Sequence, residues 1–563
     1  MPLNLDYRRS RLISFAWRLG AGANIPIAIG LIALLPYIGN RSIDADEGFS
    51  IAFARLDWQT LRIALTHLDA VFAAFYSVLH VWRLMGDGAG TLRGLSVLAT
   101  LVSIPLMYAV TEHLFNRTAA FVAATVFATN PFVVTYAHDI RPYALAVTFA
   151  LAATLFFLHL ISNPTTRNVV AYAMFAILTV VMHAFVGLVL LSHLVSLAVL
   201  ERAPGATRLV AIAFAIIALG LMPLTVLVYH VGAEQINWIQ VPQMREFFLS
   251  LTGGQIGERT VILALIVLFV TMRARHAERA VLATVIWLIV PLLVLLVVTH
   301  TVRPIFISRY AIWCAVPLAI LVGAGIASLG RPLFIATVSV FVVANAISLD
   351  WSGGRYDGEN FRAAVGYIAS HATPDDAFVA SHDDFLAVRI ARDEHPNVPF
   401  PPELYPGNAV SIWNRKAIGG EVDAVGPRRI WLIERGMMIR NNRYKSPDLI
   451  IEEHLKRRRT IVARESFGGI RVIEFGPANQ DSAPRLSQPA SRASAVSYPT
   501  TVVTLDFLRR CSKRTRSSLL PIVCSRAPRA LGERRIECCA PTRVVARRSH
   551  RLTRSRVFFR ARH

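Results

Sequence analysis

Long apolar runs recur along this chain from its N-terminus to residue 349 and then stop. A run of about 17 to 25 apolar residues crosses a hydrocarbon core of about 30 Å as a helix, which satisfies its own backbone hydrogen bonds. The composition agrees, because 54% of the 563 residues are hydrophobic and only 17% are charged, which is too apolar for an ordinary soluble enzyme. The sequence therefore predicts an α-helical polytopic membrane protein over residues 1–349.

We expect about eleven spans in this part of the chain. The stretch "VVMHAFVGLVLLSHLVSLAVL" around His183 has no clear turn, so two short spans there can equally be one long buried hairpin. The predicted ranges are 22–39, 92–112, 118–137, 142–162, 168–183, 184–201, 208–230, 259–272, 279–299, 309–328 and 331–349.

Arginine placement orients these spans, because basic residues in short loops stay on the cytoplasmic side. With the N-terminus inside, every predicted inner segment carries at least one arginine, and the basic N-terminal run is interpreted as a retained anchor. Everything after residue 350 then lies on the outer face. So do the segments "SIDADEGFS", "YAHDIRPYAL", "EQINWIQVPQMREFF" and "HTVRPIFISRY".

One apolar segment, "AVFAAFYSVLHVWRLMG", is not counted as a span. At helical spacing, Phe75, Val78 and Leu79 fall on one face and His80 and Arg83 on the other, which is typical of a helix lying in the membrane interface. If this segment crosses the membrane, every later loop changes side.

Beyond residue 350 the composition is that of an α/β domain. "GENFRAAVGYIASHA" has the period of an amphipathic helix, "TPDDAFVA" reads as a turn entering a strand, and "RRIWLIE" and "GIRVIEF" read as short strands. We place this extracytoplasmic domain at residues 350–476.

Residues 477–563 are predicted to form a disordered basic tail. The final 63 residues hold 17 Lys and Arg against three acids, so the tail carries much of the formal net charge of +23. Such a tail can bind anionic lipid or nucleic acid, but it lacks regular periodicity and interleaved aromatics. Solvated disorder is the favoured interpretation, and no nucleic-acid partner is predicted.

Acidic residues cluster at two predicted outer loops. Asp44, Asp46 and Glu47 follow the first apolar run, and Asp139 lies between the third and fourth spans. Loop acids are usually just solvated charge. Here the loop that they begin is otherwise apolar, and two carboxylate clusters facing one membrane-level cavity suit the deprotonation of a hydroxyl group beside a phosphate leaving group.

At these residues the sequence resembles the GT-C membrane glycosyltransferases. The resemblance is to the bacterial mannosyltransferase-like branch, which is related to protein O-mannosyltransferases and aminoarabinose transferases. It rests on an ordered set of motifs over residues 20 to 350: a first span, an outer loop with Asp-Glu, an interfacial helix, and then "LRGLSVLATLVSIPLMYAVTEHLFNRTAAFVAATVFATNPFVVTYAHDIRPYALAV". "EQINWIQVP" and "SRYAIWCAVPLAILVGAG" follow in the expected places.

The resemblance implies a transfer of sugar from a polyprenyl-phosphate carrier to an acceptor outside the bacterial plasma membrane. It implies mannose as the sugar, and a cell-envelope glycan, lipid or protein as the acceptor. Asp46 would be the principal catalytic carboxylate, Glu47 would support it, and Asp139 would be the acid of the second loop. Other members carry a His-Pro-Pro or Lys-Pro-Pro element that this chain lacks. Its place is taken by "HLDAVFAAFYS", with His67, Asp69 and Tyr76 as substitutes.

Outer arginines run against the usual charge bias of membrane loops. Arg141, Arg303 and Arg309 are therefore candidates to bind the carrier phosphate and to stabilise its departing charge. The alternative is that each pairs with a nearby acid or extends to the lipid headgroups. Tyr143 and Trp238 could stack on a sugar ring, although anchoring in the aromatic belt explains them equally well.

No metal site is predicted from the sequence. His138, His183 and His300 sit at outer helix ends, but without paired ligand spacing, so hydrogen bonding is favoured for them. The chain has no phosphate-cradling glycine loop, which argues against direct use of a nucleoside triphosphate. We therefore expect no cofactor and leave a divalent metal ion open.

Two alternatives to an enzyme remain. A transporter or lipid flippase would also have many spans, but transporters commonly carry internal repeats and midplane charges, and neither is evident here. A non-catalytic scaffold is the other alternative, because the Pro-Pro element is missing.

Overall fold

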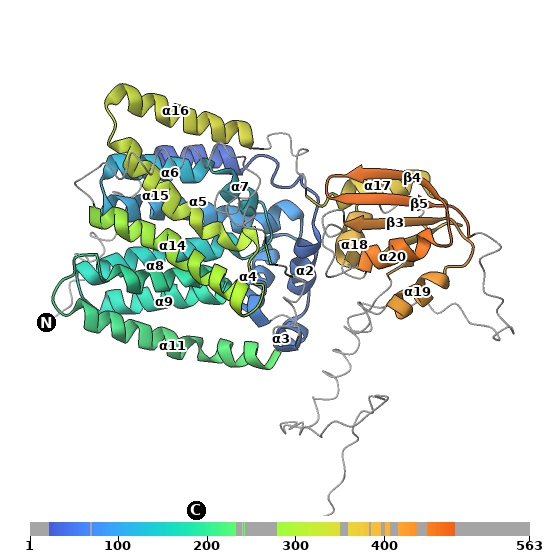
Figure 1. The fold of residues 1–563 in the computed structure, drawn as a ribbon, viewed down its shortest axis with the longest axis horizontal. Helices are drawn as coiled ribbons and strands as arrows, with labels where there is room; N and C mark the ends of the chain where they lie inside the picture. The colour runs from blue at the N-terminus through green and yellow to red at the C-terminus, as the bar shows by residue number, and fades with distance from the viewer. Residues whose placement is uncertain are drawn as a thin grey trace, which may run out of the picture. The chain divides into compact units, whose positions relative to one another are not determined.

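The computed structural model describes two kinds of architecture, a helical part and a small mixed sheet (Figure 1). The described residues are 22–67, 70–231, 239, 241–242, 278–349, 358–381, 384–395, 400–405, 415–435 and 447–478. The predicted span at 259–272 and the predicted tail lie outside these residues, apart from residues 477 and 478.

The helical part consists of α-helices of very different length. Its helices are Gly22–Leu34, α2 (Ala45–Ala54), α3 (Trp58–His67), α4 (Ala73–Trp82), α5 (Ala89–Leu114), α6 (Arg117–Thr129), α7 (Pro131–Ala137), α8 (Tyr143–Ser162), α9 (Thr166–Met182), α10 (Val189–Ser196), α11 (Ala206–Val231), α14 (Glu278–Thr301), α15 (Ala315–Ala327) and α16 (Arg331–Ser348). Short 3₁₀ turns are η1 (Ala70–Phe72), η2 (Arg83–Met85), η3 (Val186–Leu188) and η5 (Ser308–Cys314).

The apolar helices indicate a multi-pass membrane protein, but they do not confirm eleven spans. Within the described residues, five helices are long and apolar enough to cross a membrane, or six if the bent pair α6 and α7 is one span. Four predicted spans correspond to shorter apolar helices, because Gly22–Leu34, Thr166–Met182, Val186–Ser196 and Arg331–Ile347 have only 10 to 17 residues. Helix α9 ends at Met182 and η3 begins at Val186, so the stretch around His183 is not one continuous helix.

The bend between α6 and α7 places the second acidic loop. The two helices meet at 55°. Asn130 ends α6 and begins α7, where its side-chain oxygen accepts a hydrogen bond from the Phe132 N–H at 2.9 Å. Pro131 occupies the first turn of α7, where its missing N–H costs no helical hydrogen bond. The short α7 then leads directly into Asp139 and Arg141.

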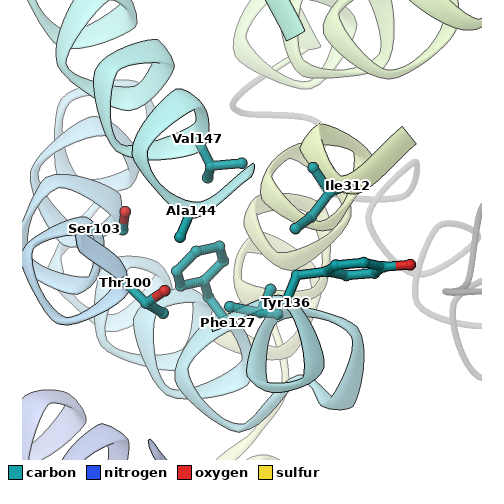
Figure 2. A pocket seen from close by; sticks show the side chains of 8 residues that line it. Thr100, Ser103, Phe127, Tyr136, Ala144, Val147 and Ile312 are labelled. Atoms are coloured by element: carbon teal, nitrogen blue, oxygen red, sulfur yellow. The ribbon is translucent and has the colours of Figure 1, made fainter. Parts of the chain in front are cut away.

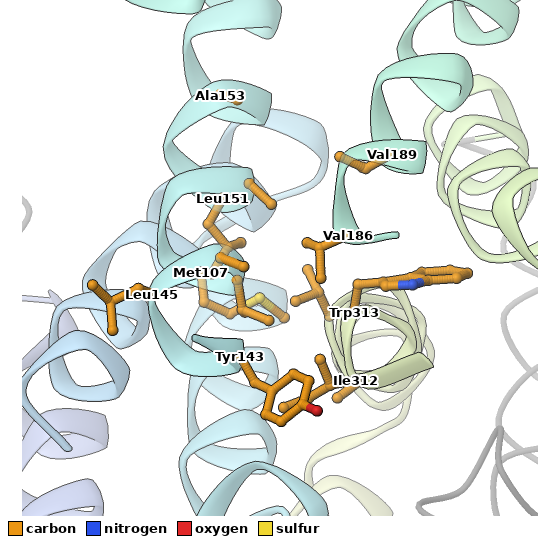
Figure 3. Close-up of a cluster of buried hydrophobic side chains, with 14 of the residues drawn as sticks. Met107, Tyr143, Leu145, Leu151, Ala153, Val186, Val189, Ile312 and Trp313 are labelled. Atoms are coloured by element: carbon orange, nitrogen blue, oxygen red, sulfur yellow. The ribbon is translucent and has the colours of Figure 1, made fainter. Parts of the chain in front are cut away.

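A continuous apolar core holds the long helices together. Figure 3 shows side chains from α5, α8, η3 and η5 that meet in it, among them Met107, Leu151, Val186 and Trp313. Close helix contact needs small residues. At Gly323 of α15 an added Cβ would lie 2.5 Å from the carbonyl oxygen of Ala119 in α6, so a larger residue there would push the two helices apart.

Helix α4, at 10 residues and a rise of about 1.5 Å per residue, is too short by itself to cross a hydrocarbon core of about 30 Å. The predicted division of its faces is wrong, however. His80 is buried beside Phe75 and Leu79, with its Nδ1 2.8 Å from the carbonyl oxygen of Ala54. Val78 is exposed instead. The reason is that α4 packs on α2, α5 and α9, and its buried face follows those contacts rather than side-chain polarity.

The second part is a five-stranded sheet with flanking helices (Figure 1). The strand order is β2-β1-β3-β5-β4, in which β1 runs parallel to β2 and β3, and β5 runs antiparallel to β3 and β4. The elements are α17 (Phe361–His371), β1 (Ala377–Ala380), α18 (Phe385–Asp393), β2 (Glu403–Leu404), α19 (Arg415–Asp423), β3 (Ile430–Arg435), α20 (Pro447–Lys456), β4 (Ile461–Phe467) and β5 (Ile470–Phe475).

The predicted elements of this α/β domain are confirmed. The helix expected in "GENFRAAVGYIASHA" is α17, and the three expected strands are β1, β3 and β5. Strand β3 is buried over its first five residues, as a central strand covered on both faces should be. Gly468, with a φ of 61°, makes the tight turn between β4 and β5 that a residue with a side chain disfavours.

Candidate functional site

The first acidic cluster starts helix α2. Asp44 is the N-cap, and its Oδ1 accepts a hydrogen bond from the Glu47 N–H at 2.7 Å. In return the Asp44 N–H donates to Glu47 Oε2 at 3.3 Å. This is a capping box, which the pattern D-x-x-E favours at a helix start. Asp46 and Glu47 therefore both lie in the first turn, but their side chains leave it in different directions.

Glu47 points into the protein and is fully bonded there. Its side chain is 0% exposed and forms two hydrogen bonds with Arg93 of α5, at 2.9 Å and 2.6 Å. Its Oε1 also accepts the Ile140 N–H at 3.0 Å. Burial works against ionisation of Glu47, but the charge and hydrogen bonds of Arg93 outweigh it and lower the pKa. Glu47 thus ties α2 to α5 and to the second acidic loop.

Arg93 is a site residue that the sequence analysis did not identify. It is fully buried, and it also donates hydrogen bonds to the backbone carbonyl oxygens of Ile38, Arg41 and Ser42. An arginine in an apolar helix needs a buried partner, so its isolated position in "LRGLSVL" was the available signal. The sequence could not show which of the nearby acids it would meet.

Asp139 lies against the same buried pair. It is 6% exposed, and its Oδ1 has no hydrogen-bond partner among the described residues. Burial, reinforced by the charge of Glu47, raises the pKa of Asp139 to about 7. Burial and the charges of Glu47 and Asp139 also raise the pKa of Asp44. The structure brings the two acidic loops together, since one oxygen of Asp139 lies within 4.8 Å of one oxygen each of Asp44 and Glu47.

Asp44, Glu47 and Asp139 are also the described residues that could hold a metal ion. One oxygen from each lies within 4.8 Å of the others, and a set of carboxylate oxygens suits a hard divalent cation. Arg93 already supplies positive charge to Glu47 at this position. The expectation that no cofactor is needed stays a prediction.

Asp46 is the open acid of the cluster. Its side chain is 38% exposed, and its Oδ2 lies 2.8 Å from Nη1 of Arg309 in η5. Arg141 Nη1 lies 3.5 Å from both the Asp46 carbonyl oxygen and Ser50 Oγ. Partial burial works against ionisation, but Arg309, Arg141 and Arg435 outweigh it and lower the pKa of Asp46 to about 2. Asp46 is therefore a carboxylate throughout the physiological pH range.

Aromatic side chains and a histidine stand beside the two arginines. The Arg141 guanidinium lies 4.7 Å from the centre of the Phe72 ring. His183 is 5.2 Å from Tyr143 and 5.1 Å from Tyr310, ring centre to ring centre. Both His183 and Tyr143 are buried, and His183 Nδ1 and the Tyr143 hydroxyl have no hydrogen-bond partner among the described residues.

A small apolar pocket, lined in part by Tyr136, lies among the helices near these aromatic side chains. Figure 2 shows the side chains that line it, which come from α5, α6, α7, α8 and η5. Thr100 and Ser103 are its polar lining residues besides Tyr136. The Tyr136 ring is 5.1 Å from the Tyr143 ring in an edge-to-face contact. Tyr136 therefore contacts both the pocket and Tyr143.

The other predicted site residues are not found in contact with Asp46 among the described residues. Tyr76 is buried in α4 and stacks on Phe53 at 4.8 Å. Arg303 follows α14 and is half-buried, six residues before Arg309. The side chain of His67, together with Asp69 and Trp238, lies outside the described residues. Of the three predicted outer arginines, the structure brings Arg141 and Arg309 to Asp46.

The predicted hydrogen bonding of the helix-end histidines holds for His138. Its Nε2 lies 2.6 Å from the carbonyl oxygen of Leu34, which fixes α7 to the end of the first helix. His300 is exposed in the last turn of α14. Neither belongs to the group of side chains that could hold a metal ion in the described part of the chain.

Comparison with known proteins gives one family match in sequence. Residues 69–229 match the family described as dolichyl-phosphate-mannose-protein mannosyltransferase. No curated protein matches the chain. The predicted resemblance to GT-C membrane glycosyltransferases is confirmed by this family match.

Solved structures with similar folds are distant in sequence. The apo structure of ArnT from Cupriavidus metallidurans is 14% identical with a TM-score of 0.49, over 82% of this chain and 98% of that one. ArnT bound to undecaprenyl phosphate has 14% identity and a TM-score of 0.48, over 84% and 99%. The archaeal oligosaccharyltransferase AglB from Archaeoglobus fulgidus, in complex with an inhibitory peptide and a dolichol-phosphate, has 12% identity and a TM-score of 0.47, over 84% and 75%.

Proposed function

We propose that this protein is a membrane glycosyltransferase that moves a sugar from a polyprenyl-phosphate carrier to an acceptor on the extracytoplasmic side. The family match over residues 69–229 supports a transferase. The observation that carries the proposal is the open carboxylate of Asp46, which pairs with Arg309, while Arg141 donates to the backbone carbonyl oxygen of the same residue. This arrangement supplies a base for an acceptor and cations for a phosphate in one place.

The proposed transfer is a direct displacement at the anomeric carbon. The acceptor oxygen forms a bond to that carbon while the bond from the carbon to the phosphate oxygen breaks, and its electron pair leaves with the polyprenyl phosphate. The acceptor proton passes to the Asp46 carboxylate. Because the pKa of Asp46 is about 2, the group is ionised and can accept a hydrogen bond from the acceptor hydroxyl. A carboxylate of low pKa is a weak base, so the proton would transfer after most of the bond to the anomeric carbon has formed.

Arg309 and Arg141 are proposed to stabilise the charge that develops on the departing phosphate. Guanidinium groups bind phosphate oxygens in two-pronged fashion, and both arginines have a buried Nε without a hydrogen-bond partner among the described residues. Arg309 pairs with Asp46 before the substrate arrives. A phosphate beside that pair would share Arg309 and leave Asp46 more open to the acceptor.

The remaining predicted roles are proposed as follows. Glu47 acts by holding α2 against α5 rather than by touching substrate, because Arg93 and Ile140 already occupy its oxygens. Tyr143 faces the sugar, and Tyr76 supports Arg141 from α4. Mannose is the proposed sugar, and a cell-envelope glycan, lipid or protein is the proposed acceptor.

The test of this function is the release of free lipid phosphate. The purified protein in lipid vesicles would be given polyprenyl phosphates that carry mannose, arabinose or aminoarabinose, each with a cell-envelope extract as acceptor. We expect one of the three to lose its sugar to the extract. Movement of intact carrier between leaflets without loss of sugar would favour the flippase alternative, and binding without either event would favour a scaffold.

The proposed bacterial plasma-membrane location has its own test. Asp375, in the turn before β1, is exposed, so Asp375→Cys offers a thiol on the α/β domain. We expect a membrane-impermeant maleimide to label this cysteine in intact bacterial cells whose outer membrane has been permeabilised. Labelling that requires lysis of the plasma membrane would place the α/β domain inside and contradict the proposed orientation.

A further inference from the structure

The α/β domain reaches the helix that carries Asp46. Helix α18 packs on α2, and the contact is close at Gly48, where an added Cβ would lie 3.1 Å from the Ala387 backbone nitrogen. Gly48 is two residues after Asp46 and in the same helix. A domain that touches α2 here can influence the direction in which the Asp46 side chain points.

A chain of charged groups makes a second contact at the start of α2. Glu359 Oε2 accepts a hydrogen bond from the Ala45 N–H at 2.9 Å. Glu359 is held in turn by Arg435, at 3.6 Å, and Arg435 Nε lies 2.8 Å from the fully buried Oδ1 of Asp384. Ala45 is the first residue of α2, so Glu359 satisfies one of the N–H groups that a helix start leaves unbonded.

A third contact holds the segment that precedes α2. The Arg362 N–H donates to Ser42 Oγ at 3.1 Å, and Arg362 Nη1 donates to the Asn40 carbonyl oxygen at 2.6 Å. Arg362 lies in the first turn of α17. The first turn of α2 and the segment before it thus contact Glu359, Arg362 of α17 and helix α18.

The position of these contacts in the sheet is informative. Asp384 follows the end of β1, and Arg435 is the last residue of β3. The carboxyl ends of neighbouring parallel strands are where α/β sheets commonly bind their ligands. In this protein the same edge binds the start of α2.

We propose that the α/β domain completes the transfer centre, with Arg435 as a positioning residue that orients Asp46 and adds a third positive charge near it. The inference rests on the proposed function. Arg435 is anchored by Asp384 and Glu359, so its guanidinium is fixed before substrate binds. It acts on Asp46 through Glu359 and the first N–H of α2, and through its own charge.

The experiment measures the local field at position 46 without relying on turnover. Asp46→Cys would be made in a background in which the five native cysteines are replaced by serine, and the alkylation rate of the thiol followed against pH. Nearby cations lower a thiol pKa and raise the thiolate fraction at pH 7. Arg435→Gln in this background is expected to slow alkylation at pH 7 by roughly two- to fivefold, and Arg435→Lys to restore most of the rate.

Arg429→Gln is the matched control. Arg429 pairs with Asp376 and Glu474 in the same domain and makes none of the described contacts with α2. It is expected to leave the alkylation profile unchanged. An Arg435→Gln profile equal to the parent, or an equal slowing by Arg429→Gln, would overturn the proposal.

Turnover distinguishes failure of the inference from failure of the proposed function. With Asp46 intact, Arg435→Gln is expected to lower kcat at least fivefold while the KM for the lipid donor stays within twofold. If the wild-type protein transfers sugar and Arg435→Gln changes neither kcat nor alkylation, only the inference fails. If the wild-type protein transfers no sugar but the alkylation shift is present, the proposed function fails and the coupling of Arg435 to position 46 stands.

Discussion

The two sides of the first turn of α2 place neighbouring acids in opposite environments. On the side facing α5, Glu47 is sealed by Arg93, and Asp139 is pressed against the pair with its pKa raised to about 7. On the side facing η5, Asp46 is open, and cations lower its pKa to about 2. Glu47 and Asp46 are neighbours in the chain, but one is buried and paired and the other is partly exposed. Burial fits Glu47 for a structural role, and exposure beside Arg309 fits Asp46 for its proposed role as the base.

The largest expected effect is on catalysis from the open side. Asp46→Asn keeps the shape of the side chain but cannot take up the acceptor proton, and loss of general-base help costs roughly 100- to 10,000-fold in rate. The measurement is lipid-phosphate release at saturating donor, with unfolding temperature recorded in parallel. Asp87→Asn, an exposed acid paired with Arg55 and Arg83, is the control and should turn over normally. Near-normal turnover of Asp46→Asn would show that Asp46 is not the general base, and the proposed difference in role between Asp46 and Glu47 would fail.

The next effect is on stability from the sealed side. Arg93→Met leaves the Glu47 charge buried without its partner, and breaking a buried pair in this way costs about 3 to 5 kcal/mol. The double variant Arg93→Met with Glu47→Leu should recover part of that loss, because no isolated charge remains. Unfolding in denaturant would measure both.

The surface pair of Arg55 with Asp87 provides the comparison for this prediction. Both side chains are 43% exposed, so Arg55→Met should cost less than about 1 kcal/mol. Equal losses from Arg93→Met and Arg55→Met would show that burial does not separate the two kinds of acid in this protein.

A smaller effect should depend on pH. The pKa of Asp139 is raised from 3.8 to about 7 in the folded protein, so the folded state binds the proton more tightly than the unfolded state does. The protein then loses stability as the pH rises from about 4 to about 7. Asp139→Asn removes this loss, and its unfolding temperature should exceed that of the wild type by a few degrees at pH 8 and by less at pH 5.

Asp57→Asn should change stability with the opposite sign. Hydrogen bonds from the Thr60 backbone and hydroxyl lower the pKa of Asp57, so this acid stabilises the protein above its unfolded pKa and loses that contribution as the pH falls. The Asn variant should therefore be less stable than the wild type at neutral pH. A gain from Asp57→Asn, or no gain at pH 8 from Asp139→Asn, would contradict the two assignments.

The smallest expected effect is that of removing metal ions. The proposed transfer draws its positive charge from Arg141 and Arg309, so chelation with EDTA should change sugar transfer by less than twofold. Loss of activity that Mn²⁺ or Mg²⁺ restores would instead assign a cation to Asp44, Glu47 and Asp139. If Mn²⁺ or Mg²⁺ no longer restored activity in Asp139→Asn, Asp139 would be a ligand of that cation and would be needed for activity rather than for structure.

Much of the fold could be predicted, because the fold class and the secondary-structure elements follow from local sequence patterns. The helical membrane class follows from the repeated apolar runs, and the elements of the α/β domain follow from their periods. The number of spans does not follow in the same way. A run such as 184–201 is apolar enough to cross a membrane, but the helix there is interrupted, and α10 has only eight residues. Whether an apolar run forms one long helix depends on its neighbours as well as on its own composition.

The sequence by itself determined where the acids and arginines of these loops lie along the chain, and the resemblance selected Asp46 among the acids. Only the tertiary structure decided which acid is paired with which cation. Asp46 and Glu47 have the same charge and adjacent positions, so no local pattern separates them. Their partners, Arg309 and Arg93, come from helices that are distant in the sequence, as does Arg435 from the α/β domain. Burial and pairing are set by these long-range contacts, and they determine which carboxylate is left open to react.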